Sequence, residues 1–364
     1  MTQIKRTRCG IEKVSQRFSA LLTFSFFAFK LEIEDREKAS VIAMAKILIP
    51  QAVAEEGVRE LLSAGHEIKM GTGVTEEELM KEAADCDAIL LRTAVVSAKV
   101  LEAGKRLKIV ARHGAGYNNV DCRAAEELGI WVTNTPDATT NSVAEYTIAA
   151  ILSASKRILE MNRALKAGDF FYKNTHKGMD LAGKTLAIIG LGRIGQAVAK
   201  KAHFGLDMKV IAFAHGRKQE EVPEYIRLVD WETAFAEADF VSLHVPLRDS
   251  TRGFIGQPEF ERMKKTAYLI NCARGEVVRE KELIAALENG QIAGAFCDVF
   301  EQEPPAAENP LLSMEQVTAT PHMASNTEEC MAAMAYQAAV QINRVLAGLE
   351  PDWPVNCPKR SLTE

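Results

Sequence analysis

The sequence lacks the features that mark several specialised classes of protein. Its seven cysteines are an odd number and no two lie closer than 25 residues, so neither a disulfide framework nor a cysteine metal site is indicated, and we expect no bound metal. There is no basic excess, because 44 Lys and Arg stand against 49 Asp and Glu for a net charge of −5. A nucleic acid partner is therefore not expected.

The sequence also lacks a long hydrophobic run. An apolar stretch at residues 18–29 is interrupted by hydroxyl side chains, among them Thr23 and Ser25, and at about 12 residues it is too short to span a bilayer. Charged residues follow it in place of a signal-peptide cleavage site. Since Met44 reads as a natural start that leads directly into a strand, we expect residues 1–43 to be an appended, poorly ordered extension. We also expect a cytoplasmic protein with reduced thiols and no membrane partner.

What the sequence does contain is an alternation of short β-branched runs and helical stretches from Met44 onward. This pattern is typical of βαβ units on a parallel sheet. At roughly 150 residues per domain, the length of 364 residues suggests two or three domains. The first series predicts strands at 46–49, 67–70, 88–91, 108–111 and 131–134, with helices that include 55–64, 76–84 and 122–128.

A second alternating series follows a long helical stretch. Apolar residues at three- and four-residue spacing predict one helix over about 141–167, which Gly168 ends. Six strands with helices between them would make a complete doubly wound sheet, and a last helix over about 327–347 is long enough to return to the first domain. The six strands are expected at 186–189, 209–213, 240–244, 267–271, 293–298 and 317–320.

The strongest local signal is GLGRIG at residues 190–195, between an apolar strand and a helix. In that context the pattern indicates a dinucleotide site. Gly190 permits the tight turn, Gly192 lets a pyrophosphate approach the backbone, and Gly195 lets helix and strand pack closely. The helix N-terminus offers free N–H groups to the phosphates. A tight turn without a ligand is the alternative, and three glycines in the right context favour the cofactor.

The residues after the second strand of this unit bear on which dinucleotide is bound. An NAD site has Asp or Glu about 20 residues on, for the ribose 2′-hydroxyl. Here Ala214 stands in that region and His215, Arg217 and Lys218 follow. A cationic cluster suits a 2′-phosphate, so the pattern favours NADP over NAD. The alternative is that these basic residues are solvent-exposed loop charges, partly compensated by two neighbouring glutamates.

Three polar residues follow strands of the second series: Arg274, Glu303 and His322. The carboxyl ends of strands form the ligand crevice of an open α/β sheet, so these side chains are candidates for one site. Reduction of a 2-keto acid needs a cation for the carboxylate and a proton donor near pH 7, roles that suit Arg and His. A carboxylate beside the imidazole favours its protonated form. On the residues alone, a solvated arginine, a capping glutamate and a structural histidine remain alternatives.

Several motifs in order carry a resemblance to a known family: RHGAGYNNVD at 112–121, NSVAE at 141–145, GLGRIG at 190–195, NCARG at 271–275, a DVF to EP stretch at 298–304, and TPH at 320–322. The sequence resembles the D-isomer-specific 2-hydroxyacid dehydrogenases, which include phosphoglycerate dehydrogenase, glycerate dehydrogenase and hydroxypyruvate/glyoxylate reductase. The resemblance runs from about Met44 to Asn356. It implies an NAD(P)-dependent oxidoreductase that reversibly reduces a 2-keto acid to a D-2-hydroxy acid.

The resemblance also implies roles for individual residues. Arg274 would bind the substrate carboxylate, while His322 would be the general acid/base, paired with Glu303. Asp298 would hold the nicotinamide carboxamide. The resemblance also places Arg193 and Ile194 along the pyrophosphate, Thr251 and Cys272 along the cofactor, and the N–H groups around Ala115 and Gly116 at the substrate carboxylate. From the residues themselves, we expect Arg217 at the cofactor and Arg92 at the substrate.

For the fold, the resemblance implies a Rossmann, doubly wound parallel cofactor domain inserted into a smaller flavodoxin-like α/β substrate domain. The cofactor domain would span 142–324, and the substrate domain 44–141 plus 325–356, with hinges at the two crossings. A homodimer formed through the cofactor domain is the family norm. Because the chain ends about ten residues after Pro354, the C-terminal regulatory domain of long phosphoglycerate dehydrogenases, with its serine feedback, is not expected.

Alternative functions remain at this point. One is phosphoglycerate dehydrogenase proper, which oxidises 3-phosphoglycerate; Arg92 or Arg112 would then accept a phosphate, although either of them equally suits a loop-bracing role. A family member acting on formate or phosphite is another. A dinucleotide-sensing scaffold, similar to corepressors that resemble this family, is disfavoured because long disordered flanks and peptide-docking features are lacking.

Overall fold

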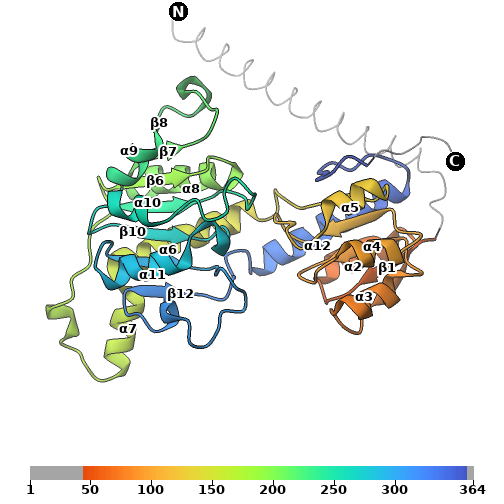
Figure 1. Cartoon of the computed structure of the whole chain (residues 1–364), viewed down its shortest axis with the longest axis horizontal. Helices are drawn as coiled ribbons and strands as arrows, with labels where there is room; N and C mark the ends of the chain where they lie inside the picture. The colour runs from red at the N-terminus through yellow and green to blue at the C-terminus, as the bar shows by residue number, and fades with distance from the viewer. Residues whose placement is uncertain (1–43, 359–364) are drawn as a thin grey trace, which may run out of the picture.

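The computed structural model describes residues 44–358, which form two parallel α/β lobes with helix α12 running between them (Figure 1). The expected N-terminal extension, residues 1–43, lies outside the described residues. Within the described part of the chain, none of the helices has the length and apolar character needed to cross a membrane. The buried apolar residues form four clusters, and these cover both faces of each sheet.

The smaller lobe is built on five parallel strands in the order β2-β1-β3-β4-β5, which is the flavodoxin-like order. All five lie within one residue of their expected positions. The middle strand, β3, is buried along its whole length, as expected for a parallel sheet covered on both faces. Its strands are β1 (Lys46–Ile49), β2 (Glu67–Met70), β3 (Ala88–Leu91), β4 (Ile109–Arg112) and β5 (Trp131–Thr133), and its helices are α2 (Glu55–Ser63), α3 (Glu76–Ala83), α4 (Ala98–Ala103) and α5 (Cys122–Glu127).

The larger lobe is a seven-stranded parallel sheet in the order β12-β11-β10-β9-β6-β7-β8. Counted from β6, this is the doubly wound dinucleotide-binding order with one strand added. The expected number of six strands was wrong, because the edge strand β8 carries an exposed charged residue, Arg227, at its centre and does not form an apolar run. The strands are β6 (Thr185–Ile189), β7 (Lys209–Phe213), β8 (Ile226–Leu228), β9 (Phe240–Leu243), β10 (Tyr268–Asn271), β11 (Gly294–Cys297) and β12 (Val317–Ala319).

The helices of the larger lobe connect consecutive strands and cover both faces of the sheet (Figure 1). The α-helices that lie between its strands are α8 (Arg193–Leu206), α9 (Trp231–Ala236), α10 (Gln257–Arg262) and α11 (Glu280–Glu288). The larger lobe also contains four short 3-10 helices: η1 (Tyr172–Asn174), η2 (Gln219–Glu221), η3 (Gly275–Val277) and η4 (Pro310–Leu312).

The long helix expected over 141–167 is two helices, α6 (Thr140–Lys156) and α7 (Ile158–Lys166). The break is at Arg157, whose φ of 53° is left-handed. Its guanidinium makes two hydrogen bonds to Glu160, at 2.6 and 2.7 Å, and these hold the turn. The apolar spacing continues across the break, so the sequence pattern did not show it. Helix α7 buries none of its residues and projects from the larger lobe (Figure 1).

The last helix, α12 (Glu328–Leu346), follows the second sheet but packs on the first. Its side chains Ala338, Ile342 and Val345 belong to the same core cluster as Ile47 and Leu61 of the smaller lobe. The chain beyond α12 also returns there, since the side chain of Asn356 accepts a hydrogen bond from the N–H of Val132. The larger lobe is therefore inserted between two parts of the smaller one.

Candidate active site

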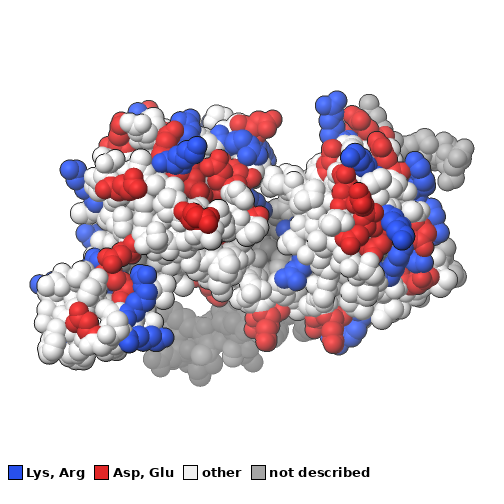
Figure 2. Space-filling view, turned by 60° about the horizontal axis from the view of Figure 1, so that its bottom comes forward, with Lys and Arg blue, Asp and Glu red and all other residues white. Residues whose placement is uncertain are grey.

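A cleft of about 690 Å³ lies between the lobes and is lined by segments that follow β3, β4, β5, β6, β9, β10, β11 and β12. These are carboxyl ends of parallel strands, where α/β proteins bind their ligands. Figure 2 shows charged side chains mainly on the outer faces of the two lobes and few where the lobes meet. Three expected residues, Arg274, Glu303 and His322, line this one cleft.

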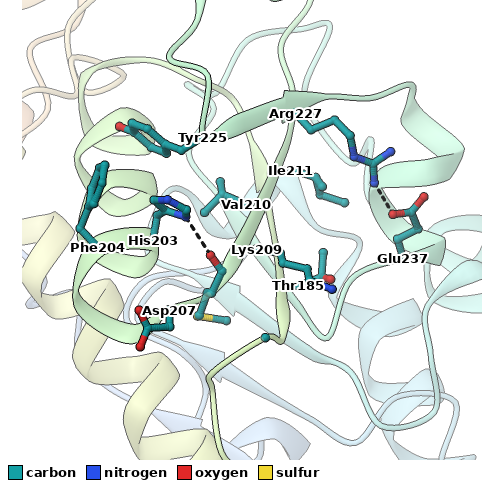
Figure 3. Close-up of a pocket in the computed structure, with 12 residues that line it drawn as sticks. Thr185, His203, Phe204, Asp207, Lys209, Val210, Ile211, Tyr225, Arg227 and Glu237 are labelled. Carbon is teal, nitrogen blue, oxygen red and sulfur yellow. Dashed lines mark hydrogen bonds and ion pairs between the residues drawn. The ribbon is translucent and has the colours of Figure 1, made fainter.

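A second hollow of about 700 Å³ lies at the opposite end of the larger sheet, against the amino ends of β6 and β7. Figure 3 shows His203, Phe204 and Tyr225 gathered on one side of it. Its polar groups are engaged in structural bonds, because Nδ1 of His203 is 3.1 Å from the carbonyl of Met208 and Arg227 pairs with Glu237. We therefore place the chemistry in the cleft between the lobes.

His322 and Glu303 form a direct pair, with imidazole Nδ1 2.7 Å from carboxylate Oε2. The other oxygen of Glu303 accepts a hydrogen bond from the N–H of Phe300 at 3.2 Å. Burial opposes ionisation of Glu303, but the bond and charge of His322, with smaller effects from Phe300 and Arg274, outweigh it and lower the pKa of Glu303. A carboxylate fixed on Nδ1 stabilises the protonated ring and leaves Nε2 to exchange a proton.

Asp298 anchors the turn that carries His322. It follows β11 and is fully buried. One carboxylate oxygen accepts from the Thr320 hydroxyl at 2.7 Å and the Met323 N–H at 2.9 Å, and the other accepts from the Ala324 N–H at 2.9 Å. These bonds support the left-handed backbone of His322, whose φ is 49°. The expected role of Asp298, at the nicotinamide carboxamide, stays a prediction.

Arg274 reaches across the cleft to the turn after β4. A Cβ atom placed on Gly116 would collide with Nη2 of Arg274, so the absence of a side chain at Gly116 allows this contact between the lobes. Burial lowers the pKa of Arg274, although the charges of Glu303 and Glu276 oppose the shift. Ala115 and Gly116 both line the cleft here, and their N–H groups make no hydrogen bond to another described residue.

Two further arginines, Arg92 and Arg112, line the same cleft. Nε of Arg112 is buried with no hydrogen-bond partner among the described residues. Burial, and then the charges of Arg274 and Arg92, lower the pKa of Arg112 to about 10, so it is charged at neutral pH. Three guanidinium groups close together are typical of a site that receives an anion.

The glycine loop has the geometry that a dinucleotide requires. Gly190 has a φ of 100°, and a Cβ there would lie 2.7 Å from the carbonyl oxygen of His244. A Cβ on Gly195 would collide with the Gly190 carbonyl, whereas one on Gly192, the N-cap of α8, would meet nothing within 4 Å. Two glycines therefore permit close packing and the third faces open space at a helix N-terminus, where a pyrophosphate fits.

The other expected cofactor residues lie in different places. Ile194 and Cys272 line the cleft, and Arg193 does so while its Nε is 2.9 Å from Asp137. Thr251 is not among the residues that line the cleft; its hydroxyl donates to the carbonyl of Pro246 at 2.7 Å. Arg217 is exposed in the turn after β7.

Sequence reasoning missed His244, which also lines the cleft. It was assigned to the end of a strand, and that position gave no reason to treat it as part of a site. Burial lowers the pKa of His244 to about 4, so the ring is neutral near pH 7. Its Nε2 is 2.9 Å from the hydroxyl of Ser242, which fixes the ring, and its backbone carbonyl lies beside Gly190.

Comparison with known proteins agrees with this arrangement. Residues 148–324 match the model of the D-isomer specific 2-hydroxyacid dehydrogenase, NAD binding domain. The chain is 39% identical over 287 residues to a glyoxylate reductase of Korarchaeum cryptofilum, covering 78% of this chain and 86% of that protein. It is 41% identical over 319 residues to a D-3-phosphoglycerate dehydrogenase of Methanocaldococcus jannaschii, covering 86% of this chain.

The match spans only about 60% of the length of that phosphoglycerate dehydrogenase. Among solved structures, an NADPH-dependent glyoxylate/hydroxypyruvate reductase from Sinorhizobium meliloti superposes with a TM-score of 0.78 at 27% identity, covering 87% of this chain and 100% of that chain. The chain therefore belongs to the D-isomer specific 2-hydroxyacid dehydrogenase family.

Proposed function

We propose that this protein is an NAD(P)-dependent oxidoreductase that reversibly reduces a 2-keto acid to a D-2-hydroxy acid. The observation that carries the proposal is the His322–Glu303 pair, at 2.7 Å, in the same cleft as Arg274 and the glycine loop. A buried cation, an acid–base pair and a dinucleotide loop are together the parts that this reaction requires.

In this proposal Arg274 binds the substrate carboxylate with two parallel hydrogen bonds. The free N–H groups of Ala115 and Gly116 bind the same carboxylate from the other lobe. His322 donates a proton from Nε2 to the carbonyl oxygen during reduction and removes it during oxidation, while Glu303 stabilises the protonated ring. A nicotinamide dinucleotide, when bound, supplies or accepts the hydride.

We propose that the lobes act as two domains, 44–141 plus 325–356 for the substrate and 142–324 for the cofactor. The chain crosses between the lobes only before α6 and before α12 within the described residues, so these two crossings are the natural hinges. Closure about them would exclude water from the cleft, as a hydride-transfer site needs.

The direct test is turnover of glyoxylate, hydroxypyruvate, phosphohydroxypyruvate, pyruvate and longer 2-keto acids with NADH and NADPH. We expect reduction of at least one of these acids at a kcat of about 1 s⁻¹ or more. Tight dinucleotide binding without turnover of any acid in the panel would contradict the proposal and favour a dinucleotide-sensing scaffold.

NADP is the cofactor that we propose. Ala214 leaves no carboxylate to bind a ribose 2′-hydroxyl, and Arg217 is exposed three residues further on. We expect kcat/KM to be higher with NADPH than with NADH, and Arg217→Ser to reduce this preference about tenfold or more, because it removes a charge-assisted bond. Arg227→Ser, in the remote second hollow, is the control. A strong NADH preference of the unaltered protein would contradict the assignment.

Oxidation of 3-phosphoglycerate is the second candidate activity, and Arg112 is the observation that favours it. Its buried Nε has no partner among the described residues, and Arg92 lies in the same cleft. A substrate with a second anionic group would supply that partner. The second candidate predicts that phosphohydroxypyruvate is the best acid of the panel, and that Arg112→Gln raises its KM far more than the KM of glyoxylate.

We further propose a cytoplasmic homodimer. Helix α7 and the loop after it project from the larger lobe (Figure 1) and leave apolar side chains exposed. Such a surface is typical of an interface between copies of a chain. The exposed apolar residues are Ile158, Leu159, Leu165, Phe170 and Phe171.

A further inference from the structure

The segment 92–94, which follows β3 and lines the cleft through Arg92 and Thr93, is held by a side chain that the mechanism does not use. Gln51, just after β1, accepts hydrogen bonds through Oε1 from the N–H groups of Thr93 and Ala94, both at 2.9 Å. Its Nε2 lies 2.8 Å from the Thr93 hydroxyl. A single amide side chain therefore engages three polar groups of two successive residues.

A second side chain holds the same segment from its other side. Nδ2 of Asn119, in the turn after β4, donates to the carbonyl of Ala94 at 2.7 Å and to the carbonyl of Arg92 at 3.4 Å. The segment belongs to neither a helix nor a strand, and of its three residues only Ala94 is buried in the core of the smaller lobe. The position of Arg92 and Thr93 therefore depends on these hydrogen bonds.

The segment needs such support because of the charge that it carries. Arg92 lies near Arg112 and Arg274, and its charge lowers the pKa of Arg112. Like charges in a partly buried cleft repel one another, and Arg92, which lies on an irregular segment, is the one free to swing away. The guanidinium of Arg92 has one described bond, to the carbonyl of Ala52 at 3.3 Å, which is too weak to fix it alone.

We propose that Gln51 is a positioning residue for substrate recognition: it fixes segment 92–94 so that Arg92 faces the end of the substrate remote from Arg274. This inference rests on the proposed function, in which Arg92 binds the substrate. Gln51 makes no hydrogen bond to His322, Glu303 or the glycine loop. Its removal therefore weakens substrate binding and leaves the chemical step and cofactor binding unchanged.

The test compares Gln51→Ala with Ser97→Ala, which removes a surface hydrogen bond to Glu76 close by. Because misplacement of a binding group by about 1 Å costs up to about 10²-fold, we expect Gln51→Ala to raise the KM of the best 2-keto acid about tenfold or more. We expect kcat and the Kd of NAD(P)H to stay within about twofold, and Ser97→Ala to leave all three constants unchanged.

Amide hydrogen exchange gives a readout that does not depend on turnover. We expect the N–H groups of Thr93 and Ala94 to exchange faster in Gln51→Ala. They should remain slow in Gln51→Glu, because a carboxylate keeps the acceptor for both groups.

An active Gln51→Ala variant with unchanged KM, or with kcat and cofactor affinity reduced in parallel with substrate affinity, would overturn the inference. Unchanged exchange at Thr93 and Ala94 would overturn it as well. Failure of the proposed function has a different signature, namely an unaltered protein that reduces no acid of the panel.

Discussion

At the scale of single residues, the cleft depends on a few side chains whose neighbours define their state. Glu303 is ionised because the bond and charge of His322 outweigh the cost of its burial. Arg274 is positioned by the missing side chain of Gly116 as much as by its own bonds. Single substitutions can test both effects.

The first residue-scale prediction concerns the acid–base pair. We expect His322→Gln to lower kcat by about 10²–10⁴-fold with the dinucleotide Kd unchanged. Glu303→Gln removes the carboxylate that holds Nδ1 of the imidazole at 2.7 Å, so we expect it to lower kcat as well, with the dinucleotide Kd unchanged. A near-normal kcat in His322→Gln would refute the assignment of the acid.

The second residue-scale prediction concerns Gly116. An alanine there would displace the guanidinium of Arg274, and we expect kcat/KM to fall about 10²-fold. The melting temperature should change little, because the collision is with the end of a flexible side chain. Gly205→Ala on α8 is the matched control, since a Cβ there meets nothing within 4 Å; equal activity of both variants would contradict the prediction.

At the scale of elements, one buried histidine, His113, links the end of the smaller sheet to helix α12. His113 follows β4, is 2% exposed, and its Nε2 is 3.3 Å from the carbonyl of Met331 on α12. Burial, and then the charge of Arg112, lower the pKa of His113 from its usual 6.5 to about 4. The folded state therefore holds this ring neutral over a range in which the unfolded chain protonates it.

This shift predicts how the stability of the protein varies with pH. Above about pH 6.5 His113 is neutral in both states and has no effect. As the pH falls from 6.5 toward 4, the unfolded state binds a proton that the folded state does not, which costs roughly 2–3 kcal/mol. We expect His113→Gln to lose less stability than the unaltered protein between pH 7 and pH 4.5 in urea unfolding. His215→Gln, at an exposed site, should follow the unaltered protein.

Elements were predictable from sequence where burial governs them. Strand β3 is a continuous apolar run and β9 is apolar apart from Ser242; both are buried along their whole length, and their positions agree with the expected ones. Three features escaped prediction, namely the short edge strand β8, the short helix α4, and the break at Arg157. Strand β8 has an exposed charged residue, Arg227, at its centre, and α4 buries only two adjacent residues, so neither gives a periodic signal. The break depends on the contact with Glu160 rather than on apolar spacing.

The features of the site also divide into some that were predictable from sequence and some that were not. Arg274, Glu303 and His322 were predictable because each follows a strand, and parallel strands bring their carboxyl ends to one edge. The bonds of Asp298 to the turn of His322 and the hold of Gln51 on segment 92–94 were not predictable. Both depend on the path of irregular loops between residues far apart in the sequence.

At the scale of the whole molecule, the arrangement of two lobes with a projecting α7 predicts a dimer. We expect Leu165→Glu combined with Phe171→Glu to convert the proposed dimer to a monomer, because charges would be buried at the interface. Light scattering coupled to gel filtration measures this. Leu62→Glu, at an exposed position of α2, should leave the dimer intact, and a double variant that remains dimeric would place the interface elsewhere.

The return of α12 to the smaller lobe also bears on how the protein is made. The five strands of that lobe leave the ribosome first, but the helix that covers one face of their sheet is complete only at Leu346. At roughly 5–20 residues per second, the roughly 200 intervening residues take about 10–40 seconds to synthesise. During that interval the apolar face around Ile47 and Leu61 lacks its cover, so the nascent chain is most exposed to aggregation while its larger lobe is being translated.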